Sequence, residues 1–144
     1  MSITFRTLES FTAQQIFDHV AVKLLEQNKQ CTIEDEEENL CAYRSEDRTL
    51  KCAAGHLMSD AEAEELIAQG KNTGCGPLLA YQTLMGMPDS GDSGDMPHYR
   101  LIAALQGTHD SFSPKAWLEH LDDIASKHFL NVKVLEDWKE KVEA

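Results

Sequence analysis

Long hydrophobic runs and an excess of basic residues are both missing from this 144-residue chain. No apolar stretch reaches the roughly 20 residues that a helix needs to cross a bilayer, and residues 1–15 lack the basic-then-apolar order of a signal peptide. Only 13 Lys and Arg stand against 25 Asp and Glu, which gives a net charge of -12. Such a charge repels nucleic acids and anionic membranes. We therefore expect a cytoplasmic protein without a direct nucleic-acid or membrane partner.

The sequence also lacks the closely spaced cysteine pairs of common zinc modules and the D-x-D-x-D-G pattern of a calcium loop. Its four cysteines are Cys31, Cys41, Cys52 and Cys75. In the cytoplasm they are expected to be thiols rather than disulfides. They are therefore buried small groups, metal ligands or nucleophiles, and we interpret Cys31 and Cys75 as packing or incidental residues.

Helical periodicity and capping patterns cover most of the chain. Thr12 begins a capping box and is followed by apolar residues at helical spacing up to about Asn28. Further helices are predicted from Ser59 to Gly70, from Pro77, over residues 98–109, after Ser113, and over residues 132–143. The predicted fold class is mainly α (α+β): a single compact domain over residues 1–144, with five or six helices and one short β-hairpin.

The hairpin is predicted across Leu40 to Cys52, where "LCAY" and "TLKC" flank the polar connection "RSEDR". Two flexible loops are expected, near residues 34–39 and 86–97. The first is a run of five adjacent acidic residues, which repel each other, and the second is rich in Gly, Ser, Asp and Pro.

A zinc site is one candidate for the chemistry, with Cys41, Cys52, His56 and His109 as ligands. The predicted hairpin would bring Cys41 beside Cys52, and a helix starting near Cys52 would place His56 one turn later. The alternative is that both thiols pack beneath the hairpin and hold no metal.

A thiol enzyme is a second candidate. If Cys52 begins a helix, the helix dipole would lower its pKa, and His109 with Asp110 would serve as base and orienting group. The alternative is that the His-Asp pair only caps a helix end.

Acidic residues form a third candidate, a surface that occupies a basic groove of another protein. The alternative is a solvated face that keeps the protein soluble. The candidate partner-binding residues are Glu34, Asp35, Glu36, Glu37, Glu38, Asp60, Glu62, Glu64 and Glu65.

The last predicted helix carries an apolar stripe that includes Leu135 and Trp138. The stripe either packs on the domain or contacts a second copy of the chain, so a homo-oligomer is an alternative partner.

The patterns "C-x-Y-R", "K-C-A-x-G-H-L-x-x-D" and "L-Q-x-x-H-D", followed by a tryptophan-containing helix, resemble a group of small uncharacterised bacteriophage and prophage proteins. The resemblance spans about Thr12 to Leu130, and the chain departs from the group in its acidic insertion before Cys41 and its extended C-terminal helix. The matching residues are Cys41, Tyr43, Arg44, Lys51, Cys52, Ala53, Gly55, Leu105, Gln106, His109, Asp110 and Trp117.

The resemblance implies an accessory protein made in the cytoplasm of a bacterial host, and it carries no known activity. Together with the charge, it leads us to expect a non-enzymatic acidic protein that binds a basic host protein, such as a nucleic-acid-handling or defence protein. The alternative function is a thiol- or zinc-dependent enzyme that uses Cys52 and His109.

Overall fold

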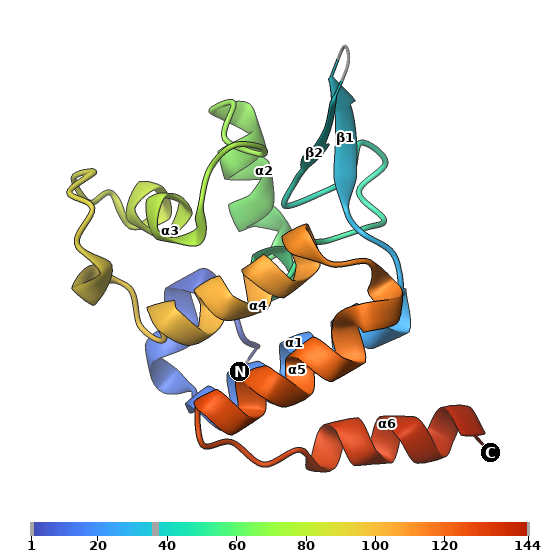
Figure 1. Ribbon diagram of the computed structural model, residues 1–144. Helices are drawn as coiled ribbons and strands as arrows, with labels where there is room; N and C mark the ends of the chain where they lie inside the picture. Colours follow the sequence, from blue (N-terminus) through green and yellow to red (C-terminus); the bar gives the residue numbers. More distant parts are fainter. Residues whose placement is uncertain (1, 36–37, 144) are drawn as a thin grey trace.

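The computed structural model describes residues 2–35 and 38–143, and over these residues the protein is a mainly helical domain with one antiparallel hairpin (Figure 1). This confirms the fold class predicted from the sequence. The elements in chain order are η1 (Phe5–Ser10), α1 (Ala13–Gln27), β1 (Thr32–Asp35), β2 (Glu38–Cys41), η2 (Ala54–Leu57), α2 (Asp60–Ala68), α3 (Pro77–Met85), η3 (Ser93–Asp95), α4 (Tyr99–Ser111), α5 (Pro114–Lys127) and α6 (Lys133–Glu143).

Helix α1 is the central element, in contact with η2, α4, α5 and α6. Thr12 and Gln15 form the predicted capping box at its start, and Asn28 ends it in the left-handed conformation. The buried face repeats at helical spacing, as its apolar pattern predicted. Its members are Ile16, Phe17, Val20, Ala21, Leu24 and Leu25.

The hairpin lies earlier in the chain than the sequence predicted, so the predicted ribbon over Leu40 to Cys52 is wrong. Strands β1 and β2 pair from Thr32 with Cys41 to Asp35 with Glu38, so residues 34–35 and 38–39 of the predicted loop lie in the strands. Residues 36 and 37 of that loop lie outside the described residues. Beyond β2, the predicted ribbon retains a single isolated bridge, between Arg44 and Lys51.

The reason for this difference is a competing partner for the chain after β2. Ala42 bridges Thr73, and the Tyr43 amide donates to the carbonyl of Asn72 at 3.1 Å. The Arg44 amide donates to the side-chain oxygen of Asn72 at 3.0 Å. Residues 42–44 therefore pair mainly with the segment between α2 and α3, where the sequence predicted pairing with residues 49–52.

The predicted loop over residues 86–97 is irregular except for η3, but one part of it packs on the domain. Met96 is buried, and Gln82 of α3 donates hydrogen bonds to Ser90 and Asp95. These contacts attach the end of the predicted loop to the domain.

Helix α6 confirms the predicted C-terminal helix to within one residue at its start and packs along α1. Leu135 is buried in this contact, and Trp138 is half-buried against the core. A buried Leu135 is not available to a second copy of the chain, so its prediction as an oligomer contact is wrong. Among the described helices, none has both the length and the apolar character that a bilayer span requires.

Candidate functional site

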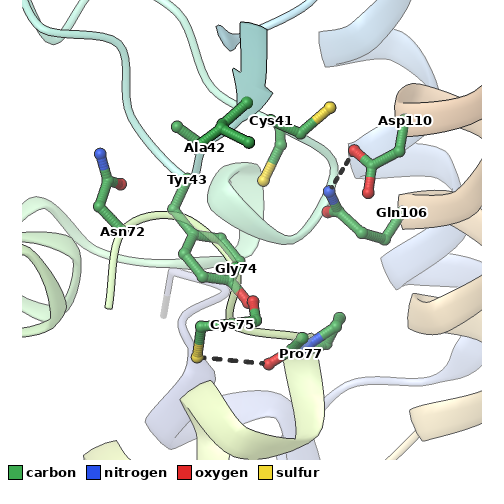
Figure 2. A pocket seen from close by; sticks show the side chains of 12 residues that line it. Cys41, Ala42, Tyr43, Asn72, Gly74, Cys75, Pro77, Gln106 and Asp110 are labelled. Atoms are coloured by element: carbon green, nitrogen blue, oxygen red, sulfur yellow. Dashed lines mark hydrogen bonds between the residues drawn. The ribbon is translucent and has the colours of Figure 1, made fainter. Parts of the chain in front are cut away.

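A cavity of about 330 Å³ lies at the base of the hairpin, between the end of β2, the segment that leads into α3, and α4. Three of the four cysteines line it, namely Cys41, Cys52 and Cys75. Figure 2 shows Asp110 and Gln106 at one side of this cavity and the ring of Tyr43 extending toward Cys75. The Tyr43 hydroxyl donates a hydrogen bond to the carbonyl of Cys75.

A buried arginine holds the wall behind Tyr43. The Arg44 guanidinium donates to the carbonyls of Gly55 at 2.7 Å, Tyr43 at 3.2 Å and Met58 at 3.2 Å. Gly55 is required at its position, because a Cβ there would collide with the backbone oxygen of Tyr43. These contacts fix the backbone on which Tyr43 and Cys52 stand.

His109 is fully buried, and its hydrogen bonds set its protonation state. Its Nε2 accepts the backbone N–H of Cys31 at 2.9 Å, so the ring proton must be on Nδ1. Nδ1 then donates to Oδ1 of Asp110 at 2.8 Å, and the ring of Trp117 stacks on the imidazole. An imidazolium would point a second N–H at the Cys31 amide, so His109 is neutral.

Asp110 combines a fixed position with an unbalanced charge. Its Oδ1 also accepts from Gln106 Nε2 at 2.8 Å, and the Gln106 orientation is set by the Ala54 amide, which donates to its oxygen at 2.8 Å. The Asp110 side chain is 38% exposed, and no lysine or arginine in the described part of the chain lies within ion-pair distance of it.

The predicted zinc ligands do not come together as a set. Cys41 Sγ, a ring nitrogen of His109 and a carboxylate oxygen of Asp110 lie within 4.8 Å of one another. Cys52 lines the same cavity, but its buried Sγ accepts the Gly55 amide at 3.3 Å. His56 does not line this cavity; it lines a different cleft, together with residues of α1.

The three clustered atoms do not suit a zinc ion as they stand. A metal-bound Nδ1 requires its proton on Nε2, where it would oppose the Cys31 N–H. His109 therefore lacks a lone pair to offer unless its hydrogen bond to Cys31 breaks.

The thiols are protonated at neutral pH. Burial raises the pKa of Cys31 to about 12, and burial followed by the nearby Asp110 raises that of Cys41 to about 11. Burial also raises the pKa of Cys75 and, further still, that of Cys52. The predicted lowering of the Cys52 pKa by a helix dipole is wrong, because Cys52 is buried and the helix that follows it has only four residues.

No protein-family model, curated protein or solved structure matches the chain. Its resemblance to phage proteins therefore stays a prediction.

The acidic candidates on α2 are used inside the protein. Glu62 is buried, and its two oxygens accept the backbone N–H groups of Phe5, Arg6 and Ser59 at 2.9 to 3.1 Å. A carboxylate in that position stabilises the start of α2 and the N-terminal segment. The prediction that Glu62 contacts a partner is therefore wrong.

The other three predicted residues of α2 face arginines of the same chain. The ion pairs are Arg48–Glu64 at 2.6 Å, Arg6–Glu65 at 3.1 Å and Arg44–Asp60 at 3.5 Å. Glu64 and Glu65 are about half-exposed, and Asp60 is 91% exposed. A partner that bound here would have to displace or share these arginines.

The hairpin carries the rest of the predicted acidic surface. Glu34 is exposed on β1, and the register sets Asp35 opposite Glu38. Glu36 and Glu37 lie outside the described residues. From the sequence, Asp110 was predicted as the orienting group for His109 or as part of a helix cap, and Gln106 only matched the phage-protein pattern. Neither was predicted to line a cavity with Cys41, because no local pattern indicates that α4 meets the end of β2.

Proposed function

We propose that this protein acts by binding a basic partner protein, and that the cavity at the base of the hairpin receives a lysine or arginine side chain of that partner. The observation that carries the proposal is the Asp110 carboxylate, which lies on the cavity wall with no cationic side chain beside it in the described structure. The cavity walls are mainly apolar, which suits the methylene stem of such a side chain while its charged end meets Asp110.

A neighbouring depression extends this surface along the hairpin. It has a volume of about 250 Å³, shares Leu40 and Asn72 with the first cavity, and reaches Ile33 and Glu34. Asp110 thus lies at one end of the two adjoining cavities and Glu34 at the other, with apolar residues such as Leu40 between them.

The state of the thiols supports binding rather than catalysis. A thiol enzyme needs a thiolate and a base that can accept its proton. All three cysteines in this cavity have raised pKa values. His109 has no free lone pair to accept a thiol proton, because its Nε2 accepts the Cys31 N–H and its Nδ1–H donates a hydrogen bond to Asp110. The resemblance to phage and prophage proteins suggests the context, a bacterial cytoplasm in which the basic partner belongs to the host.

The test is the binding of a fluorescent arginine-rich peptide, measured by anisotropy over a salt titration. We expect binding at low salt that weakens as salt increases, because counter-ions screen exposed charges. Asp110→Asn should weaken binding by about fivefold or more, the effect of losing one desolvated charge contact. Asp123→Asn is the matched control, since it removes the same charge from an exposed position of α5 that lines neither cavity.

Two results would contradict the proposal. Equal weakening by Asp110→Asn and Asp123→Asn would show a response to net charge and no site at the hairpin base. The second is a failure to retain any basic protein from a bacterial lysate at low salt, measured with the immobilised wild-type protein.

A further inference from the structure

A second cleft lies on the other side of the 49–60 segment and is the largest of the described cavities, at about 930 Å³. One wall is the face of α1 that carries Gln15, His19 and Lys23, which are spaced four residues apart and so share a face. The opposite wall carries Lys51 and His56. The cleft thus brings two lysines and two histidines together on a protein whose net charge is -12.

The two lysines of the cleft differ from three of the four arginines, because no carboxylate of the described residues lies within ion-pair distance of them. Lys51 is half-buried and its position is fixed. Its amide donates to the Gln27 side chain at 3.0 Å, and its carbonyl accepts from the same side chain at 2.8 Å. Lys23 is exposed at the end of the same wall as His19.

The His56 side chain is largely buried at the wall of this cleft. Its pKa is lowered to about 3, first by burial and then by Lys51, His19, Arg44 and Lys23, all of them basic groups. Its Nε2 is buried without a hydrogen-bond partner in the described structure. The backbone of His56 is held in place by His19, whose Nε2 donates to the His56 carbonyl at 3.0 Å.

Two carboxylates also line the cleft. Asp60 lies 3.5 Å from Arg44, whereas Asp18 accepts a hydrogen bond from the neutral Gln14 side chain at 2.8 Å and keeps its charge. Neither carboxylate lies within ion-pair distance of Lys23 or Lys51 in the described structure, so both ammonium groups can meet an anion. Away from the lysines, the lining includes Ile3, Phe11 and Met58, which offer an apolar surface.

We propose that this cleft binds a small phosphate monoester, with the phosphate between Lys23 and Lys51 and the organic group against Phe11 and Met58. A phosphate dianion contacts both ammonium groups at once, whereas a carboxylate carries a single charge to share between them. The volume falls within the range of small-molecule sites. This site is separate from the cavity at the hairpin base, so the phosphate proposal does not depend on the proposed partner binding.

The test is an NMR titration of the 15N-labelled protein with phenyl phosphate, inorganic phosphate, benzoate and phenol. We expect phenyl phosphate to shift the amides around Lys51, His56 and the C-terminal half of α1 and to bind about fivefold or more tightly than inorganic phosphate, because only the ester reaches the apolar wall. Benzoate should bind more weakly than phenyl phosphate, and phenol should cause no comparable shifts.

Charge-matched variants locate the site. Lys51→Gln should weaken phenyl phosphate binding about tenfold, whereas Lys115→Gln, which changes an exposed position of α5 outside the cleft, should change it less than twofold. Amide dispersion in the same spectra shows whether each variant is folded. If Lys51→Gln does not fold, Lys23→Gln tests the same prediction from an exposed position.

Three outcomes would overturn the proposal. Shifts spread evenly over lysines throughout the chain would show nonspecific anion binding. Equal affinity for benzoate and phenyl phosphate would exclude a phosphate site. Unchanged affinity in Lys23→Gln, together with unchanged affinity in any folded Lys51→Gln protein, would exclude the cleft.

Discussion

Helix α2 and the base of the hairpin are both acidic, yet their carboxylates do different things. On α2, Glu62 holds three backbone amides, and the other carboxylates face arginines. At the hairpin base, Asp110 accepts hydrogen bonds from neutral groups only. The comparison shows that the number of acidic residues does not locate an interaction surface. What matters is which of them lack an internal partner.

The scarcity of arginine explains why the two regions differ. The chain has four arginines, and three of them, Arg6, Arg44 and Arg48, lie against α2. At the hairpin base, the Asp110 carboxylate therefore accepts hydrogen bonds only from neutral groups, Gln106 and His109. The first region is therefore stabilised by its charges, and the second keeps a charge available to a partner. Four predictions would sharpen this contrast or break it.

The largest effect is expected from Arg44→Met. It leaves the carbonyls of Tyr43, Gly55 and Met58 buried without donors, and we expect a loss of about 3–5 kcal/mol in the free energy of unfolding. Urea denaturation measures it. Arg48→Met removes an exposed ion pair and should cost less than about 1 kcal/mol. Similar costs for the two variants would mean that Arg44 is not the support of the α2 region.

Glu62→Gln and Glu64→Gln together compare a buried and a half-exposed carboxylate of α2. In the wild type, the two carboxylate oxygens of Glu62 accept three backbone N–H groups, whereas glutamine has only one acceptor oxygen. We therefore expect a loss of about 2 kcal/mol in the free energy of unfolding. Glu64→Gln changes the same charge at a half-exposed position and should cost under about 1 kcal/mol. If both variants unfold at the same urea concentration, the separation of structural from surface charge on α2 is wrong.

His56 makes stability depend on pH. Its folded pKa of about 3 lies below the ordinary value of 6.5, so the unfolded chain takes up a proton before the folded one does as pH falls. The stabilising contribution is therefore full above pH 6.5 and is lost between pH 6.5 and 3, with a slope of up to about 1.4 kcal/mol per pH unit. Urea midpoints from pH 7 to pH 4 should fall less steeply for His56→Gln than for the wild type. Parallel curves would contradict the prediction.

The smallest effect on stability is expected from Asp110→Asn. The asparagine oxygen still accepts from His109 and Gln106, and the side chain is partly exposed, so the cost should be about 1 kcal/mol or less. Urea denaturation beside Glu62→Gln gives the direct comparison. A cost equal to that of Glu62→Gln would show that the charge of Asp110 is structural, and the contrast between the two regions would disappear.

Much of the fold was predictable because its signals are local. Thr12 with Gln15, and Ser59 with Glu62, form capping boxes over three residues, and both were predicted from the sequence. The pairing of residues 42–44 was not predictable, because Asn72 and Thr73 compete for it from beyond α2. A hairpin pattern describes which segments are able to pair, and it does not say which partner prevails.

The candidate site was predictable only in part for the same reason. Cys41 and His109 were predicted as neighbours and do lie together, but Asp110 replaces Cys52 and His56 in their cluster. The tautomer of His109 depends on the amide of Cys31, on a segment between α1 and the hairpin. No spacing within α4 carries that information, so the sequence could not show that Nδ1 is occupied by a proton.

The sequence by itself determined where the helices begin and end, that the protein is strongly acidic, and that one hairpin interrupts the helices. These properties depend on residue type and on contacts within a few positions of the chain. Only the tertiary structure decided which carboxylates are paired, which thiols are buried, and which lysines face an open cleft. Burial and charge pairing depend on segments far apart in the sequence meeting in space. For that reason Glu62 is buried and binds three backbone amides, whereas Asp110 has no cationic partner and lies at the wall of a cavity in the described structure.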